Sequence, residues 1–511
     1  MRLAAALFVS TFIIGGVAVA QDGPRLAASD PYYSIGKQTL AERAAVKPNK
    51  KRAKNVIIFI GDGMDPTTVT AARIFDGQTR GEEGEENYLS FERFPNLAMA
   101  KTYSTTNQIA DSAATMSAMM TGVKTKSGML SETNAAKVDD CASGLKNEAL
   151  TLGELSEMAG MATGVVSTAR LTHATPGAVY SHSVDRDWEA DVDLSAEAKE
   201  QGCKDIARQL IEFPFGDGVD VAMAGGRSNF LPNDVADPEY PEKKGRRRDG
   251  RNLTTEWTAK SPNRVYVWNK PDFDAIDPKG HPQVLGLFEP SHMQYESDRD
   301  ADGAGEPSLA EMTGKAIDIL SQNKNGFFLM VEAGRIDHAH HAGNAARALK
   351  DTQALSQAVA LARSKTSEKD TLIIVTADHG HTMAIQGYAK KGNNILGLST
   401  GEKQHPDDGE YALAADGKPY TTLSYANGPG SVFYGELDNG KRQTPTPEEV
   451  TDINYRQQSL IPGPAETHGG QDVTIYASGP HAYLFGGIVE QNYIFHVIND
   501  ALDLSKRAGA K

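Results

Sequence analysis

Four apolar, β-branched runs that each end abruptly in polar residues constrain the fold of this chain most strongly. Their hydrophobicity is continuous rather than alternating, which indicates strands buried on both faces, as in a parallel sheet. Helical patterns lie among the runs, so we predict an α/β fold, a three-layer sandwich around a largely parallel central sheet. The strand runs are Asn55–Met64, Thr163–His173, Gly326–His338 and Thr371–His381, and the helical patterns are Leu150–Ala159, Leu194–Phe213, Leu309–Gln322 and Ala345–Ser364.

The chain has 511 residues, which exceeds the usual size of one compact core. Between residues 387 and 466, Gly, Pro, Asp and Asn are frequent and helical periodicity disappears, so we predict an inserted subdomain there. The last segment returns to a strand followed by a helix and is expected to complete the core. The predicted parts are a signal peptide (1–20), an N-terminal arm (21–53), the α/β core (54–386), the insertion (387–466) and the rest of the core (467–511).

The first twenty residues have the form of a cleavable secretory signal. A basic residue, Arg2, precedes an apolar run that ends in Ala18-x-Ala20. The alternative is an uncleaved membrane helix, but no second apolar run long enough to span a bilayer follows, and the C-terminal residues are polar. We therefore expect an exported protein, periplasmic or secreted, without a membrane anchor.

Cys141 and Cys203 are the two cysteines of the chain. In an oxidising compartment, an even pair favours a disulfide over two idle thiols. We therefore predict a Cys141–Cys203 disulfide, with two free buried thiols as the alternative.

The net charge of −15 argues against a protein that binds nucleic acid. A basic stretch, Lys243–Arg251, and an acidic stretch, Glu82–Glu86, are both typical of solvated loops. Neither stretch predicts a macromolecular partner.

Carboxylates and imidazoles gather where the predicted strands end, and in α/β sheets function gathers at those ends. Asp337 and His341 are four residues apart, so a helix that begins there places both on one face. Such mixed ligands suit zinc and related divalent ions, and the candidates exceed the four ligands of one tetrahedral site. The sequence therefore predicts more than one metal. The other candidates are Asp62, Glu332, Asp378, His379 and His468.

Ser112 lies in the stretch Ile109–Gly122, where a loop turns into a predicted helix. Taken alone, Ser112 is best interpreted as a helix N-cap. Two close metals, however, form a clamp suited to displacement at phosphorus, and coordination can deprotonate a serine hydroxyl. An arginine whose planar fork holds two phosphate oxygens is also expected, and Arg186 is the candidate. In that context we interpret Ser112 as a nucleophile at a helix N-terminus, where an anion is favoured.

Six motifs follow one another along the chain: NVIIFIGDGM, DSAAT, THATPGAVYSHSVDRDW, FFLMVEAGRIDHAHH, VTADHGH and ETHGGQD. With these motifs the sequence resembles the alkaline phosphatase family, and it is closer to animal-type enzymes than to the compact enteric bacterial form. The resemblance extends from about Lys54 to Leu504. It implies hydrolysis of phosphomonoesters through a phosphoserine intermediate, at a site with two zinc ions and one magnesium ion.

The resemblance also implies a role for each matching residue. Ser112 is the implied nucleophile, and Arg186 the implied phosphate clamp. His173 is expected near the magnesium, His381 is expected to orient a zinc ligand, and His338 is expected near the phosphate. The implied ligands are Asp337, His341 and His468 for the first zinc, Asp62, Ser112, Asp378 and His379 for the second, and Asp62, Thr175 and Glu332 for magnesium.

Outside this centre, the resemblance implies a bridged cysteine pair and a crown-like insertion at 387–466, and with the crown a homodimer. The hydrophobic C-terminal signal of a lipid anchor is lacking. Asp65 departs from the family pattern, because a small residue is usual after the GDGM motif. A calcium site is implied on oxygen ligands, with exposed acidic loops as the alternative. Its expected ligands are Glu239, the Phe288 carbonyl, Glu289 and Glu306, which replaces the usual Asp.

Two other functions stay open at this stage. One is a phosphodiesterase or sulfatase-type hydrolase of the same superfamily, although Arg186 and the third metal site favour monoesters. The other is a non-catalytic phosphate or zinc binder, which an intact nucleophile with a full ligand set disfavours.

Overall fold

The computed structural model describes residues 26, 28–280, 282–400, 411–432 and 442–510. The chain forms two compact units, Met1–Lys47 and Pro48–Lys511. The described part of the first unit consists mainly of helix α1 (Pro31–Ala45), which begins where the Asp30 carboxylate accepts a hydrogen bond from the N–H of Tyr32. The predicted signal peptide at 1–20 lies outside the described residues.

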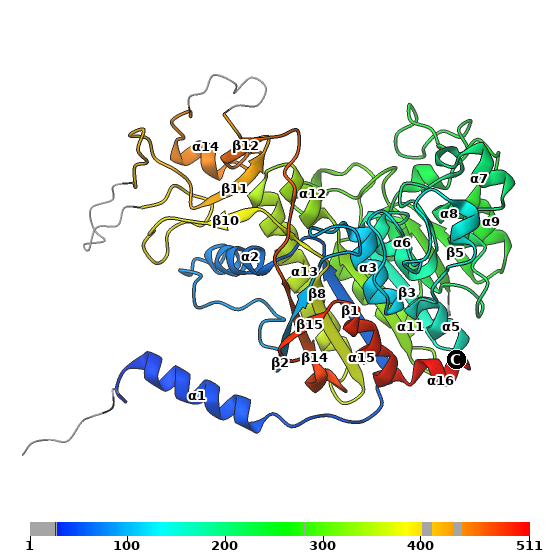
Figure 1. Ribbon diagram of the computed structural model, residues 1–511, viewed down its shortest axis with the longest axis horizontal. Helices are drawn as coiled ribbons and strands as arrows, with labels where there is room; N and C mark the ends of the chain where they lie inside the picture. The colour runs from blue at the N-terminus through cyan, green and yellow to red at the C-terminus, as the bar shows by residue number, and fades with distance from the viewer. Residues whose placement is uncertain (1–25, 27, 281, 401–410, 433–441, 511) are drawn as a thin grey trace, which may run out of the picture. The chain divides into compact units, whose positions relative to one another are not determined.

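The second unit is built around a sheet that has ten strands in the described part of the chain (Figure 1). All neighbouring strands run parallel except β14, which is antiparallel to both of its neighbours. The three central strands are buried at every position except Asn55, which explains their continuous apolar runs. The strand order is β15 (Ile488–Glu490), β2 (Asn96–Lys101), β14 (Val473–Ser478), β8 (Thr371–Ala377), β1 (Asn55–Gly61), β7 (Phe327–Ala333), β3 (Ala162–Arg170), β4 (Val221–Gly225), β6 (Gln283–Leu287) and β5 (Arg264–Val267).

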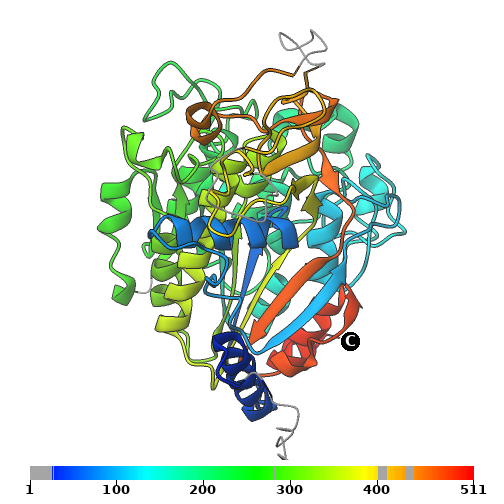
Figure 2. The ribbon, with the colours of Figure 1, turned by 90° about the vertical axis from the view of Figure 1, so that its left-hand side faces the viewer.

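Helices cover both faces of this sheet, as Figure 2 shows with the strands seen between two helical layers. One layer contains α2 (Pro66–Gln78), α11 (Leu309–Leu320) and α13 (Ala345–Lys365), and the other contains α3 (Ser112–Thr121), α5 (Leu152–Met158), α6 (Ala174–Tyr180) and α15 (Tyr493–Leu502). The predicted α/β sandwich around a largely parallel sheet is confirmed. The remaining α-helices of the second unit are α4 (Cys141–Gly144), α7 (Ala196–Glu200), α8 (Ile206–Ile211), α9 (Leu253–Ala259), α10 (Lys270–Asp274), α12 (Arg335–His341), α14 (Pro447–Thr451) and α16 (Leu504–Ala508).

The single helix predicted over Leu194–Phe213 is wrong, because the chain forms two short helices there, α7 and α8. Gly202 has a φ of +92°, a left-handed conformation that ends a helix and that glycine adopts without strain. Asp205 then starts α8, because its carboxylate accepts a hydrogen bond from the N–H of Arg208. Gly202 and Asp205 mark the helix boundaries through local backbone conformation and capping, which the apolar periodicity does not report.

The predicted disulfide is confirmed: Cys141 at the start of α4 is bonded to Cys203 between α7 and α8. The two Cα atoms are 6.0 Å apart, within the usual range for a disulfide. The bond joins two surface segments that are separated by 62 residues in the sequence.

Removing this disulfide with the double substitution Cys141→Ser/Cys203→Ser is expected to lower the free energy of unfolding by about 4 kcal/mol, because a loop of this length is released in the unfolded chain. Denaturant unfolding of the variant and of the parent protein, each with and without reductant, measures the loss. Reductant should destabilise the parent and leave the variant unchanged. A parent protein indifferent to reductant would contradict the prediction.

A smaller sheet contains β10 (Met383–Ile385), β11 (Leu423–Gly428) and β12 (Ser459–Pro462). Most of it falls within the predicted insertion, whose boundaries at 387 and 466 stay predictions. A two-stranded ladder follows, in which β13 (His468–Gly469) pairs with β9 (Gly380–His381) and places His468 opposite His381. This pairing brings two parts of the chain that are almost ninety residues apart to one point.

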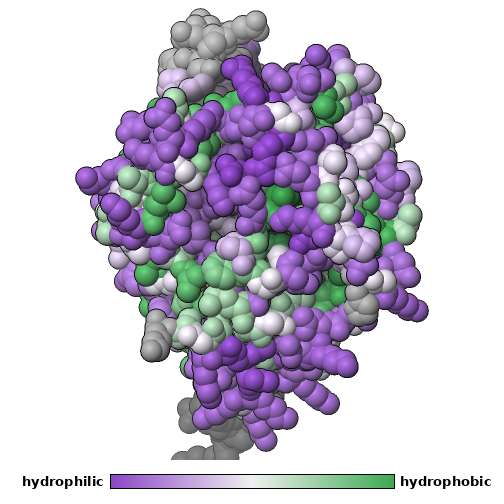
Figure 3. Space-filling view, turned by 90° about the vertical axis from the view of Figure 1, so that its right-hand side faces the viewer, coloured by the Kyte–Doolittle hydropathy of each residue, from purple (hydrophilic) through white to green (hydrophobic). Residues whose placement is uncertain are grey.

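The register of the central strands determines where the polar residues meet. Gly61 at the end of β1 pairs with Ala333 of β7 and with Ala377 of β8. The residues that follow these strands therefore emerge together at the carboxyl edge of the sheet. Apolar side chains are concentrated in the core, whereas most of the face shown in Figure 3 is hydrophilic (purple).

Candidate metal centre

Four side chains from three segments form the first group at the carboxyl edge of the sheet: Asp337 and His341 on α12, His381 on β9 and His468 on β13. The Nε2 atom of His341 lies 3.2 Å from Oδ1 of Asp337, and Nε2 of His468 lies 3.1 Å from Nε2 of His341 and 3.4 Å from that Oδ1. Ligands bound tetrahedrally at zinc distances are about 3.4 Å apart. Three of these atoms therefore have the spacing that one zinc ion requires.

Hydrogen bonds to backbone carbonyls orient two of these imidazoles. The Nδ1 atom of His341 lies 2.6 Å from the carbonyl oxygen of Glu466, and Nδ1 of His468 lies 2.9 Å from that of Ala110. A carbonyl can only accept, so each Nδ1 carries a proton, which leaves Nε2 as the nitrogen that can bind a metal. This is the tautomer that metal-bound histidines usually adopt when a backbone group holds the other nitrogen.

His381 is held differently, because both of its ring nitrogens face carboxylates. Its Nε2 lies 2.9 Å from Asp337 Oδ1, and its Nδ1 lies 2.6 Å from Glu466 Oε2. Burial opposes the charged ring, but the two hydrogen-bonded carboxylates outweigh burial and raise the pKa of His381 to about 10. A protonated imidazole has no lone pair for a metal. This geometry suits a residue that orients Asp337.

The second group consists of Asp62, Asp378 and His379, which directly follow β1 and β8. The Nε2 atom of His379 lies 3.3 Å from Asp62 Oδ1 and 3.2 Å from Asp378 Oδ2. The other oxygen of Asp378 accepts hydrogen bonds from the N–H groups of Gly63 and His379, which aims Oδ2 at the group. Burial lowers the pKa of His379 to about 3, so the ring is neutral and able to bind a cation.

The third group contains Asp62 again, with His173 before α6 and Glu332 on β7. Thr175, buried at the start of α6, faces Glu332. One oxygen of Glu332 accepts a hydrogen bond from the Ser167 hydroxyl, and the other has no partner among the described residues. Asp62 belongs to two groups, so its carboxylate stands between two candidate metal positions.

The charges of this region call for cations. Asp62 and Glu332 are fully buried, and the two oxygens of Asp62 accept no hydrogen bond from the described chain. Burial, followed by the charges of Asp378 and Asp337, raises the pKa of Asp62 well above its usual range. Burial also raises the pKa of Glu332 to about 7. Bound divalent cations would remove this cost, so the residues fit the predicted ions.

Ser112 is the first residue of α3, and the N-cap is Asp111, whose carboxylate accepts a hydrogen bond from the N–H of Ala114. Interpreting Ser112 as the cap is therefore wrong. Its buried hydroxyl instead lies 3.1 Å from Nε2 of His379, the atom that faces the two carboxylates of the second group. The hydroxyl thus combines a position beside the candidate ligands with a helix N-terminus.

Arg186 reaches the same place from the segment after α6. Its guanidinium donates to Asp111 Oδ2 at 3.1 Å and to His173 Nε2 at 3.2 Å. Asp111 therefore both caps the helix of Ser112 and positions the arginine. Asp111 thus links Ser112 and Arg186, the two residues that a phosphate would contact.

His338 is part of a cluster of three imidazoles beside this centre. Its ring centroid lies 4.0 Å from that of His292 and 5.6 Å from that of His173. His292 was not predicted, and its two ring nitrogens face the backbone N–H and the guanidinium of Arg170. Burial lowers the pKa of His338 well below its usual range, so its ring is neutral in the protein as described.

The acidic residues predicted to bind calcium form a separate cluster. Glu239 and Glu289 come together, and the third close carboxylate is Asp302. Glu306 is buried nearby, and one of its oxygens accepts a hydrogen bond from the N–H of Gln294. Burial raises the pKa of Glu306 to about 9, and Glu289 and Asp302 add to the effect. Phe288 is buried directly after β6, and its carbonyl oxygen accepts no backbone hydrogen bond from the described residues.

Two functional neighbours were missed by sequence reasoning. The Glu466 carboxylate accepts hydrogen bonds from the ring of His381 and from the N–H and hydroxyl of Thr382. Its place in the ETHGGQD motif, two residues before His468, was the signal that could have identified it. Asp65 caps α2 and also accepts hydrogen bonds from the N–H of His381 and the amide of Gln471. Asp65, the residue that departs from the family pattern, therefore connects the start of α2 to β9, which carries His381.

Known proteins resemble this chain over nearly its whole length. A family model for alkaline phosphatase matches residues 53–504. An alkaline phosphatase of Gadus morhua is 43% identical over 456 residues, which cover 88% of this chain and 92% of that protein. The tissue-nonspecific alkaline phosphatase isozyme of Felis catus is 42% identical over 478 residues, which cover 92% of this chain and 88% of that protein.

A solved structure shares the fold at lower identity. It is a mutant of the alkaline phosphatase from the Antarctic bacterium TAB5 with Mg bound, 20% identical, with a TM-score of 0.58 over 89% of this chain and 99% of that one. The family model and the curated relatives, together with the grouped ligands around Ser112, lead to one conclusion. This chain belongs to the alkaline phosphatase family, whose members are phosphomonoesterases.

Proposed function

We propose that this alkaline phosphatase acts through a phosphoserine at Ser112, in a centre that takes two zinc ions and one magnesium ion. The observation that carries the proposal is the position of the Ser112 hydroxyl, 3.1 Å from an imidazole nitrogen that faces two buried carboxylates. The proposed ligands are Asp337, His341 and His468 for one zinc, Asp62, Ser112, Asp378 and His379 for the other, and Asp62, Thr175 and Glu332 for magnesium, with His173 beside them.

When bound, the cations supply positive charge that favours the alkoxide form of Ser112 and stabilises the oxygens of the reacting phosphoryl group. The Ser112 oxygen attacks phosphorus, a Ser112–phosphorus bond forms, and the bond to the leaving oxygen breaks; that oxygen takes a proton from solvent and leaves as the alcohol. Water then attacks phosphorus, the Ser112–phosphorus bond breaks, and the products are phosphate and the free serine hydroxyl. Arg186 donates to two phosphate oxygens through its planar fork, and the N-terminus of α3 adds backbone N–H groups.

A panel of p-nitrophenyl substrates tests this function directly. The metal-loaded protein should hydrolyse p-nitrophenyl phosphate at least about 100-fold faster than the bis-ester or the sulfate, because only the monoester presents a dianion to Arg186 and the cations. A chelator should abolish the activity, and zinc with magnesium should restore it. Faster cleavage of the diester or sulfate, or activity unaffected by chelator, would contradict the proposal.

Export, a homodimer and a calcium site are proposed as well. Export, into the periplasm or out of the cell, is supported by the signal-like segment and by the Cys141–Cys203 disulfide. The described residues include no helix with the length and hydrophobicity needed to cross a membrane. A homodimer is proposed from the resemblance of the insertion to the animal-type crown. Calcium is proposed at Glu239, Glu289 and the adjacent carboxylates Asp302 and Glu306.

A further inference from the structure

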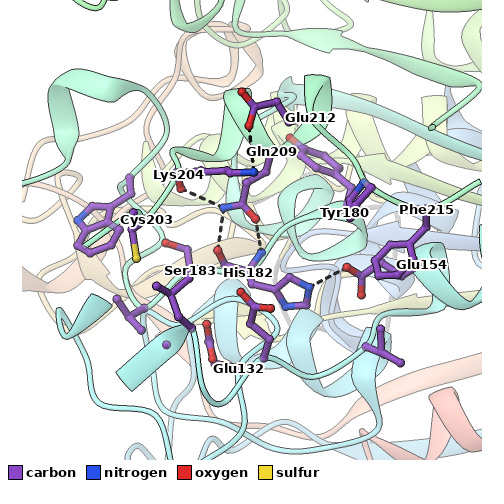
Figure 4. Close-up of a pocket in the computed structure, with 18 residues that line it drawn as sticks. Glu132, Glu154, Tyr180, His182, Ser183, Cys203, Lys204, Gln209, Glu212 and Phe215 are labelled. Carbon is purple, nitrogen blue, oxygen red and sulfur yellow. Dashed lines mark hydrogen bonds and ion pairs between the residues drawn. The ribbon is translucent and has the colours of Figure 1, made fainter. Parts of the chain in front are cut away.

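A cavity of about 390 Å³ lies beside the disulfide, bordered by residues near α4, α5 and α8 (Figure 4). Its volume falls in the range of small-molecule sites. None of its lining residues belongs to the three groups of the metal centre or to the calcium cluster. The family's chemistry therefore does not account for it.

Glu132 is the polar side chain that distinguishes this cavity. The residue is only 2% exposed, and its oxygen Oε2 is buried without a hydrogen-bond partner among the described residues. Figure 4 shows the carboxyl group directed toward the ring of His182, into the space between the labelled side chains. Burial raises the pKa of Glu132 to about 8, although the charge of His182 acts in the opposite direction.

The cations near Glu132 are already committed to other groups. His182 uses Nε2 to bind Glu154 at 2.8 Å and Nδ1 to bind the carbonyl oxygen of Ser131 at 3.0 Å, so it has no N–H left for Glu132. Lys204 is paired with Glu212 at 2.9 Å. The cavity therefore presents a buried carboxyl group without a cationic partner of its own, and a bound cation that brings hydrogen-bond donors would stabilise the charged form of that group.

The rest of the lining is mixed, and apolar side chains form one wall of it. Val184 and Trp188 are buried walls, Phe215 is half-buried, and Leu145 and Leu150 are exposed at the cavity's border. A metal ion would not use this surface, and Glu132 is in none of the groups of three or more potential metal ligands among the described residues. An organic cation uses both features, because its charged end meets the carboxylate and its body covers the apolar wall. Aromatic rings also attract such cations.

We propose that this cavity binds a small organic ammonium ion, which donates hydrogen bonds to the Glu132 carboxylate and packs its apolar body against Val184, Trp188 and Phe215. The chemical class is a primary amine, protonated at neutral pH, on a short aromatic or aliphatic chain. The proposal is independent of the phosphatase mechanism, since it uses no residue of the metal centre.

Titration calorimetry with 2-phenylethylammonium tests the site. The metal-loaded protein is first saturated with inorganic phosphate, which keeps the amine away from the metal centre. We expect one ammonium to bind per chain, at least about tenfold more tightly than its neutral analogue 2-phenylethanol, because a buried charged hydrogen bond is lost with the alcohol. Absence of saturable ammonium binding would overturn the proposal.

Glu132→Gln should remove the preference, so that the ammonium and the alcohol bind equally weakly. The matched control is Glu148→Gln, the same change at an exposed carboxylate that lines the same cavity; it should alter ammonium affinity by less than about threefold. A preference that persists in Glu132→Gln would overturn the assignment. If that variant fails to fold, the parent protein crystallised with the amine decides, since the nitrogen must lie within hydrogen-bond distance of Glu132.

Discussion

Replacing Ser112 with alanine is expected to lower kcat for phosphomonoesters by at least about 1,000-fold while leaving the bound metal nearly unchanged. The hydroxyl is the one group at this position that can form a bond to phosphorus. The second metal group keeps Asp62, Asp378 and His379, so the loss of one ligand oxygen leaves three. Steady-state kinetics together with metal analysis of the same preparation measures both quantities.

The control for this variant lies in the same helix. Ser117 is also a buried serine of α3, but its hydroxyl donates to the carbonyls of Ala113 and Met129 and accepts from the N–H of Ser131. Ser117→Ala should therefore lower stability by about 1–3 kcal/mol and keep kcat. Acid-quenched parent protein should carry phosphate on Ser112. Near-parental turnover in Ser112→Ala would show that another group attacks phosphorus.

The fold was predictable because the clearest pattern in the sequence, the continuous apolar runs, follows directly from the burial of the central strands. The strands β1, β7 and β8 are buried on both faces, and such strands are apolar at most positions, with Glu332 near the carboxyl end of β7 as an exception. The helix over Leu194–Phe213 failed because Gly202 and Asp205 set helix ends through local backbone geometry, which periodicity does not report. The strand of the last segment, β14, was expected, but its antiparallel direction depends on pairing between distant segments and was not visible in the sequence.

The candidate site followed most directly from the sequence where a side chain stands at a strand end. Asp62 and Asp378 are such residues, and the register of β1 with β8 brings them together. Glu466 and Asp65 act through hydrogen bonds across the fold, to His381 and Gln471, so their roles appear only once the β9–β13 ladder is formed. The N-cap of α3 is Asp111 and not the neighbouring Ser112. Both residue types are favoured at N-caps, so sequence preferences do not locate the helix start to within one residue.

Asp62→Asn is expected to have opposite effects on stability with and without metal. In the loaded protein the variant loses a ligand shared by two groups, so bound metal should fall by more than one equivalent and activity by at least about 100-fold. In chelated protein the variant should be more stable than the parent, because it lacks a buried carboxylate crowded by Asp378 and Asp337. Glu332 belongs to one group only, so Glu332→Gln should lose a single equivalent of bound metal.

The pH dependence of the chelated protein follows from the same groups. Burial raises the folded-state pKa of both Asp62 and Glu332, the latter to about 7, so their stabilising protonated forms are lost as pH rises through those values. The chelated parent should therefore melt at lower temperature at about pH 8 than at about pH 5, and Asp62→Asn should reduce this difference.

Asp351→Asn is the control for the metal loss in Asp62→Asn, because Asp351 is buried with its pKa raised to about 8 yet belongs to no ligand group among the described residues. It should also stabilise the chelated protein but retain metal and activity, and equal metal loss in both variants would mean that Asp62 is not a shared ligand.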